Sequence, residues 1–242
     1  MSAGTVYGVG LGPGDPELMS VRADRLVRGA AHVAYFRKAG ATGRARGIVK
    51  GMVRPDAHEH PMDYPLTTEI PFSDPRYNEA LSRFYAEASA HLRALAEAGE
   101  DVVVLCEGDP FFYGSFMHLH VRLKEHVPVR VVPAITGMSA AWTATGEPVT
   151  WGDDVLTVLA GTLPEAELAR RMAEADALVV MKIGRNLGRV RRALAAAGMA
   201  ERAFLVEYAS MSDERVTPLR AVEGEAAPYF SIVVVHGRGR RP

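Results

Sequence analysis

Three glycine- and proline-bearing loops hold the residues that are best suited to binding a small ligand. The first, Gly8-Val9-Gly10-Leu11-Gly12-Pro13-Gly14-Asp15, follows a short apolar run, as do the second, residues 107–114, and the third, residues 133–139. Glycine lets the backbone adopt positive φ and lets a ligand approach the main chain closely. Ligands of open α/β sheets bind beyond the carboxyl ends of strands. The loops therefore indicate a small-molecule site at such an edge.

The first loop does not fit the two common nucleotide-binding motifs. When G-x-G-x-x-G is counted from Gly8, its last position falls on Pro13. Arg37 and Lys38 follow the apolar run 32–36, whereas a dinucleotide site has an acidic residue there to bind the ribose. A P-loop is excluded because no glycine of the chain is followed by lysine. These mismatches argue against a dehydrogenase.

The elements that must position these loops alternate between short apolar runs and amphipathic stretches, which is typical of an α/β fold. The apolar runs predict strands over residues 5–10, 32–36, 102–106, 129–132, 155–160, 177–183, 203–207 and 230–236. Apolar residues at three- and four-residue spacings predict a helix over 76–98. A polar segment at 146–154 divides the chain into two α/β lobes, 1–147 and 148–242. Each lobe is expected to hold a mostly parallel sheet flanked by helices.

Composition narrows the class of protein further. Hydrophobic residues make up 48% of the 242 residues and charged residues 24%, which favours a globular chain over a disordered one. The net charge of −1 provides no field that would attract nucleic acid or a membrane surface. No apolar run approaches the ~20 residues of a membrane helix. The single cysteine, Cys106, and the lack of an export segment after Met1 predict a cytoplasmic protein.

Taken together, the first loop, Gly108-Asp109-Pro110 and Pro133-Ala134-Ile135-Thr136 resemble the motifs of the tetrapyrrole methyltransferases. These enzymes methylate a macrocycle with S-adenosylmethionine on the way to cobalamin and sirohaem. The resemblance covers nearly the whole chain and implies two lobes with the active site in the cleft between them, and a homodimer. Segments 107–117 and 64–68 are similar to the branch that methylates C20 of precorrin-2, or of its cobalt complex, to give precorrin-3A or cobalt-precorrin-3.

The resemblance also implies which residues bind the methyl donor. In the first lobe, which would also hold the macrocycle, it points to Pro13, Gly108, Asp109, Ile135 and Thr136. In the second lobe, which would complete the donor pocket, it points to Ala160, Gly161, Met181, Tyr208, Ala209 and Ser231. Relatives often carry threonine near the position of Ser231.

The chemistry implied is an in-line transfer of a methyl group to a ring carbon, which requires positioning more than a catalytic triad. The methylated carbon must also lose a proton. Glu107, Asp109 and Tyr113 are the candidate proton acceptors, and a water molecule is the alternative. Many relatives have glycine where Glu107 stands, so this residue marks a subgroup.

A flat, polycarboxylate macrocycle calls for apolar faces and a basic rim. Residues 37–54 contain six basic side chains and no acid, and Arg37 and Lys38 are the candidates for binding carboxylate arms. Phe111 and Phe112 are the candidates for packing against the ring. The alternatives are a solvated basic loop and ordinary core packing. Residues 58–60, His-Glu-His, are expected in a surface loop, and no metal is expected to bind there.

Other readings stay open at this stage. A methylase of the same family could act at another macrocycle position, or on RNA or protein. A non-catalytic carrier of a tetrapyrrole is the alternative from a different class. No nucleic acid or membrane partner is expected.

Overall fold

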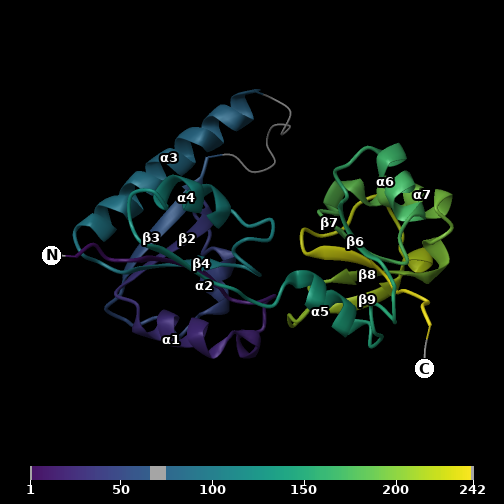
Figure 1. The fold of residues 1–242 in the computed structure, drawn as a ribbon, viewed down its shortest axis with the longest axis horizontal. Coiled ribbons are helices and arrows are strands. Elements are labelled where there is room, and N and C mark those ends of the chain that lie inside the picture. Colours follow the sequence, from purple (N-terminus) through teal and green to yellow (C-terminus); the bar gives the residue numbers. More distant parts are fainter. Residues whose placement is uncertain (1, 66–74, 241–242) are drawn as a thin grey trace. The chain divides into compact units, whose positions relative to one another are not determined.

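The computed structural model describes residues 2–65 and 75–240 (Figure 1). Residues 66–68, which belong to the predicted segment 64–68, lie outside the described residues. The chain forms two compact units, Met1–Thr136 and Gly137–Pro242. The second unit thus begins at Gly137, whereas the polar segment 146–154 predicts its start at residue 148. The difference is helix α5, Gly137–Ala144, which packs through Ala141 against Val206 and Val234 of the second unit.

The first unit is built on a five-stranded sheet in which every pair of neighbours is parallel. In spatial order its strands are β3 (His58–Tyr64), β2 (His32–Lys38), β4 (Val102–Cys106), β1 (Val6–Gly10) and β5 (Val129–Val132). Helices α3 (Pro75–Glu97) and α4 (Phe116–Leu123) cover one face of the sheet. Helices α1 (Val21–Gly29) and α2 (Arg44–Ile48) pack on the other face, which has its own hydrophobic core (Figure 1). This two-sided cover explains why every residue of β4 is buried.

The second unit holds a mixed sheet. Its strands, in spatial order, are β6 (Leu156–Ala160), β7 (Ala177–Met181), β10 (Ser231–Val235), β8 (Ala203–Glu207) and β9 (Arg215–Pro218). Only β6 and β7 are parallel, and the other three pairs are antiparallel. Helices α6 (Glu165–Ala173) and α7 (Leu187–Ala196) share one core with the sheet, and α5 belongs to a second, smaller one.

The α/β class is confirmed in both units, but the expectation of a mostly parallel sheet is wrong for the second one. The segment between β8 and β9 is a short turn, in which the Met211 N–H donates to the Tyr208 carbonyl at 2.8 Å. A parallel pair needs a crossover connection of about a dozen residues, so β8 and β9 must be antiparallel. Strand β10 then lies between β7 and β8 and runs opposite to both.

Two strands were not predicted from the sequence. The expectation of a loop at residues 58–60 is wrong. These residues begin β3, which pairs with β2 over its whole length. Strand β9 was also missed. Both are edge strands, mostly exposed or half-buried, and each contains a proline, so neither shows an apolar run. The long helix predicted over 76–98 is confirmed as α3.

Among the described residues, none of the helices has the combined length and hydropathy that crossing a bilayer requires.

Candidate active site

All five strands of the first unit end at the same edge of the sheet because all are parallel. The three loops predicted to bind a ligand follow β1, β4 and β5, which are neighbours in the order β4-β1-β5. Arg37 and Lys38 close β2, directly beside β4. The topology therefore gathers the sequence-predicted residues of this unit at one edge.

The first two loops are hydrogen-bonded to each other beyond the ends of their strands. The Leu11 N–H donates to the Cys106 carbonyl at 2.9 Å, and the Gly108 N–H donates to the Gly12 carbonyl at 2.8 Å. Gly12 and Gly108 both have positive φ, +80° and +63°, which glycine adopts without strain. The parallel β1–β4 pairing is thus followed by an isolated antiparallel bridge between Gly12 and Gly108.

Gly10 is the point at which all three loops touch. A Cβ atom at this position would lie 2.6 Å from the Ala134 Cβ, 2.8 Å from the Gly108 carbonyl oxygen and 2.9 Å from the Pro110 Cδ. No real Cβ atom tolerates such contacts. The absence of a side chain at Gly10 is therefore what lets the loops pack together.

The Asp109 carboxylate joins the second loop to the third. Its Oδ1 accepts a hydrogen bond from the Phe111 N–H at 2.9 Å, and its Oδ2 accepts one from the Ala134 N–H at 3.0 Å. Each carboxylate oxygen is thus engaged by the backbone, one inside its own loop and one across the edge. This arrangement suits a residue that positions the loops.

The second loop presents aromatic side chains to solvent. Phe111 is 48% exposed and Tyr113 45% exposed, and in the third loop Ile135 is 41% exposed, although large apolar side chains are normally buried. Phe112 is half-buried and its ring lies 4.9 Å from that of Tyr113. Tyr113 has a φ of +55°, a conformation that costs a non-glycine residue about 1–3 kcal/mol.

Glu107 follows the buried Cys106, whose thiol pKa is raised by burial and by the neighbouring acids Asp109 and Glu107. Glu107 is exposed to solvent, yet the protein around its carboxyl displaces part of the hydrating water, and this desolvation raises its pKa. The Arg44 charge and the Ala45 backbone N–H act in the opposite direction and lower the pKa. A raised pKa brings a carboxylate closer to the range of a general base that works near neutral pH.

Three of the six basic side chains in the stretch 37–54 form ion pairs with acids that lie outside it. Arg37 Nε contacts Asp63 Oδ1 at 2.6 Å, and Arg46 Nη2 contacts Glu59 Oε1 at 2.8 Å. Arg54 pairs with Asp56. These acids belong to β3 or precede it. The sequence pattern predicts a loop at residues 58–60 and therefore gives no sign of this pairing. Lys38 is exposed at the end of β2.

In the second unit, too, one edge of the sheet collects the predicted residues. Strands β7 and β8 both run antiparallel to β10, and β6 runs parallel to β7. The carboxyl ends of β6, β7 and β8 and the amino end of β10 therefore share an edge, which carries Ala160, Gly161, Met181, Tyr208, Ala209 and Ser231. The Gly161 N–H donates to the Met181 carbonyl at 2.7 Å, and the Tyr208 N–H donates to the Phe230 carbonyl at 2.8 Å.

Backbone strain is concentrated at these same places. Among the described residues, the non-glycine residues with positive φ are Tyr113, Lys182, Tyr208 and Ser210. Tyr113 lies in the second loop, Lys182 directly follows β7, and Tyr208 and Ser210 follow β8. Strained conformations of this kind persist where the surrounding structure imposes them, which is frequent at ligand sites. The sequence shows no signal for the strain at Lys182 and Ser210, because only the backbone angles reveal it.

Ser231 contributes a buried hydroxyl to this edge. Only 2% of the residue is exposed, and its Oγ has no hydrogen-bond partner within the described part of the chain. A buried polar group without a protein partner is suited to bonding a ligand. Its neighbour across the ladder is Glu207, a buried acid that sequence reasoning missed and that accepts a hydrogen bond from Arg215 Nε at 2.6 Å.

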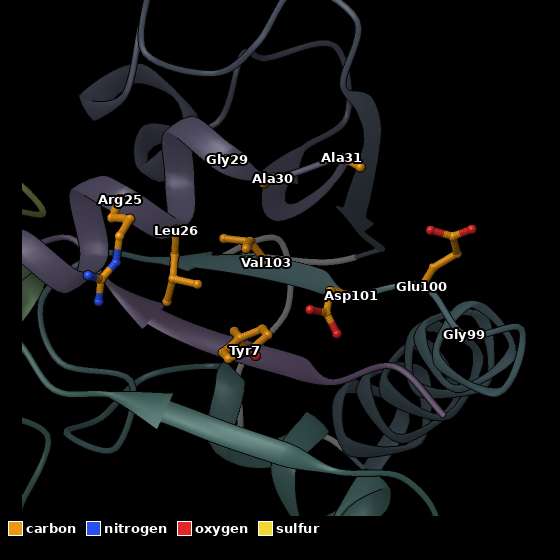
Figure 2. Close-up of a pocket in the computed structure, with 10 residues that line it drawn as sticks. All are labelled: Tyr7, Arg25, Leu26, Gly29, Ala30, Ala31, Gly99, Glu100, Asp101 and Val103. Atoms are coloured by element: carbon orange, nitrogen blue, oxygen red, sulfur yellow. The ribbon is translucent and has the colours of Figure 1, made fainter. Parts of the chain in front are cut away.

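A pocket of about 340 Å³ lies elsewhere in the first unit (Figure 2). Tyr7, Leu26 and Val103 face it, and Glu100 and Asp101 stand at its side. These residues belong to the starts of β1 and β4, to α1 and to the turn before β4, so the pocket is at the amino edge of the sheet. It contains none of the predicted site residues.

Histidines gather at this amino edge as well. His32 Nδ1 lies 3.0 Å from His60 Nε2, and His91 Nε2 lies 2.9 Å from His60 Nδ1. The two nitrogens of the His60 ring thus face different partners and cannot point at one shared ion. No group of three or more ligating side chains within the described ranges has the geometry of a metal site.

Residues 5–223 match the family model described as tetrapyrrole (corrin/porphyrin) methylases. Over all 242 residues the chain is 48% identical to a Sinorhizobium protein named precorrin-2 C(20)-methyltransferase and covers 99% of it. It is 47% identical to the Mycobacterium tuberculosis protein CobIJ, of which it covers 48%. Identity with the Salmonella typhimurium cobalt-precorrin-2 C(20)-methyltransferase is 28%, over 96% of each chain.

Two solved methyltransferase structures are similar to this chain in fold. The cobalt precorrin-4 methyltransferase CbiF matches with a TM-score of 0.71 and 24% identity, over 96% of this chain and 94% of that one. The Thermus thermophilus uroporphyrin-III C-methyltransferase, solved with S-adenosylhomocysteine, matches with a TM-score of 0.68 and 25% identity, over 96% and 92%.

Proposed function

The chain belongs to the tetrapyrrole (corrin/porphyrin) methylase family, and from that premise we propose that it transfers a methyl group from S-adenosylmethionine to C20 of precorrin-2, giving precorrin-3A. The observation that carries this proposal is the 48% identity, over the full length, with a precorrin-2 C(20)-methyltransferase. Identity with the enzyme named for the cobalt-containing substrate is only 28%. The difference favours the metal-free macrocycle.

The residues on the two edges fit an adenosyl ligand. At Gly108 a Cβ would meet nothing within 4 Å, so this part of the backbone is open to a ligand. The buried Ser231 hydroxyl can exchange a hydrogen bond with a polar group of the ligand. The donor-binding set of this proposal is Pro13, Gly108, Asp109, Ile135, Thr136, Ala160, Gly161, Met181, Tyr208, Ala209 and Ser231. When bound, S-adenosylmethionine supplies a methyl group on a sulfonium with a good leaving group.

The protein's main contribution is to hold the reactants in line, which lowers a barrier by ~7–11 kcal/mol. Asp109 serves this task by fixing the second loop against the third. Phe111, Phe112 and Tyr113 offer apolar surface to the faces of the macrocycle. Lys38, and Arg37 through the part of its guanidinium that Asp63 leaves open, face the carboxylate arms.

We assign removal of the C20 proton to the Glu107 carboxylate. An electron pair of the ring forms the C20–methyl bond while the sulfur–methyl bond breaks and its electron pair stays on the sulfur, which leaves S-adenosylhomocysteine. The C20–H bond then releases its proton to a Glu107 oxygen and returns its electron pair to the ring. Asp109 is less suited because both of its oxygens accept backbone hydrogen bonds. The raised pKa of Glu107 makes its carboxylate a stronger base than an ordinary glutamate. The family resemblance is also the basis for proposing a cytoplasmic homodimer.

The test is an anaerobic methyl-transfer assay read by mass spectrometry. Purified protein and S-adenosylmethionine are offered precorrin-2 and, separately, its cobalt complex. We expect one added methyl group on precorrin-2, at C20 by NMR. Methylation of the cobalt complex alone would reverse the choice of substrate. No methylation of either ring would contradict the proposed reaction.

A Glu107→Gln variant tests the assignment of the base in the same assay. We expect kcat to fall by roughly 10²–10⁴-fold, the usual contribution of a general base, with unchanged donor affinity. An unchanged kcat would contradict this assignment and favour a water molecule as the acceptor of the C20 proton.

A further inference from the structure

The hydroxyl of Tyr64 connects the end of β3 to the end of the second loop. Tyr64 is the last residue of β3, and its hydroxyl is hydrogen-bonded to Ser115 Oγ. Ser115 directly precedes α4 and follows the aromatic residues of the loop. The bond therefore spans from an edge strand to the far side of the segment 107–114.

Ser115 is placed to cap a helix but its side chain does something else. It occupies the N-cap position of α4, where a serine hydroxyl normally accepts a hydrogen bond from a backbone N–H of the first turn. No such bond is formed here. The Oγ atom is used for the contact with Tyr64 instead.

The ring of Tyr64 is held by other aromatic residues. It stacks on Phe36 of β2 with centroids 5.4 Å apart and an interplanar angle of 18°, and it lies 5.1 Å from Phe84 of α3. Phe84 in turn contacts the buried Tyr85, whose ring stacks on His118 of α4 at 4.4 Å. These contacts hold the Tyr64 ring and orient its hydroxyl independently of the bond to Ser115.

The second loop is thus attached at both of its ends. At its start, Gly108 bonds to the first loop and Asp109 to the third. At its end, Ser115 bonds to Tyr64. Between these attachments lie the exposed Phe111 and the exposed, left-handed Tyr113. Such a conformation persists only where its surroundings impose it.

We propose that the hydrogen bond between Tyr64 and Ser115, here called the clamp, holds the aromatic loop in the shape that binds the macrocycle. Tyr64 and Ser115 are positioning residues: they act on the macrocycle only through the aromatic residues 111–113. This inference rests on the proposed function for the identity of the macrocycle. We expect the Kd of S-adenosylmethionine not to depend on the clamp, because the residues of this loop that are proposed to bind it, Gly108 and Asp109, lie at the opposite end of the loop.

The experiment compares Tyr64→Phe and Ser115→Ala with the wild-type protein, and uses Tyr35→Phe as the matched control. Tyr35 lies in the same sheet and its hydroxyl donates a hydrogen bond to Glu59 of β3 at 2.8 Å, so its partner is not a residue of the loop. Steady-state kinetics with precorrin-2 give KM and kcat, calorimetry gives the Kd of S-adenosylmethionine, and hydrogen exchange reports on the loop without any substrate. The informative amides are Phe112, Met117 and His118, which donate backbone hydrogen bonds in and after the loop.

We expect both clamp variants to raise the KM for precorrin-2 by about 3- to 10-fold, the range for one lost hydrogen bond, with kcat and donor Kd unchanged. Their double variant should be no worse than either single one, because the two groups form one bond. The informative amides should exchange faster in both variants and not in Tyr35→Phe. Unchanged KM, with or without faster exchange, would overturn the inference. If the wild-type protein methylates no macrocycle, the proposed function fails, and unchanged exchange would then overturn the clamp separately.

Discussion

Two buried serine hydroxyls, Ser89 Oγ and Ser231 Oγ, have no hydrogen-bond partner in the part of the chain that the structure describes. Ser89 lies on α3 among core residues of the first unit, whereas Ser231 begins β10 at the edge that carries the proposed donor site. A buried hydroxyl without a partner costs about 1–3 kcal/mol of stability. The two residues are chemically alike and differ in location, so each is a control for the other.

Replacing Ser231 by alanine should weaken donor binding without weakening the fold. We expect the Kd of S-adenosylmethionine to rise about 3- to 10-fold in calorimetry, because one hydrogen bond to the ligand is lost. The free energy of unfolding should stay within about 0.5 kcal/mol of the wild-type value or rise, since no protein hydrogen bond is broken. Ser89→Ala should behave alike in unfolding but leave the Kd unchanged. An unchanged Kd in Ser231→Ala would remove this residue from the donor site.

At the scale of elements, histidines link β2, β3 and α3 at the amino edge of the first sheet. His60 of β3 contacts His32 of β2 and His91 of α3, His58 stacks on His32, and Glu100 lies 3.5 Å from His32. Burial lowers the pKa of His60, and the neighbouring histidines His91, His32 and His58 lower it further. These contacts attach the edge strand β3 to its neighbours.

The His60 shift predicts a loss of stability in mild acid. Its folded pKa lies below the ordinary value of 6.5, so the unfolded chain takes up the proton more readily. The stabilising contribution is therefore present above about pH 6.5 and is lost as the pH falls towards the folded pKa. Denaturant unfolding from pH 8 to pH 5 should show a smaller fall in His60→Gln than in the wild-type protein. The exposed His126→Gln is the control, and an identical fall in all three proteins would contradict this prediction.

At the scale of the whole molecule, the chain consists of two compact units with separate hydrophobic cores. The proposed donor-binding residues are divided between them, on the carboxyl edge of the first sheet and the corresponding edge of the second. A ligand that contacts residues of both units should affect both. A ligand that contacts one unit should leave the exchange of the other unchanged.

Hydrogen exchange with and without S-adenosylmethionine tests this division. We expect slower exchange at Gly108 and Ala134 in the first unit and at Gly161 and Tyr208 in the second, because these amides hydrogen-bond at the two edges. Donor at 100 times its Kd should also raise the unfolding free energy by about 2.7 kcal/mol. Amides that line the amino-edge pocket serve as the internal control. Protection confined to one unit would exclude the residues assigned in the other.

The sequence by itself determined the α/β class, most of the strands and the three loops. Strands such as β4 are apolar throughout because helices cover both faces of the sheet, and that burial is visible in one dimension. Glycines at positions 10, 12 and 108 signal close approach or positive φ, which few other residues permit. The family resemblance likewise rests on these local motifs.

Only the tertiary structure decided which groups are already paired. Arg37 reads as a free cation beside the loops, but β3 brings Asp63 against it, and an edge strand with exposed residues and a proline carries no apolar pattern. The direction of β10, the strain at Lys182 and the bond between Tyr64 and Ser115 depend on contacts between residues far apart in the chain. Such contacts leave no periodicity in the sequence, because each is set by how separate elements meet.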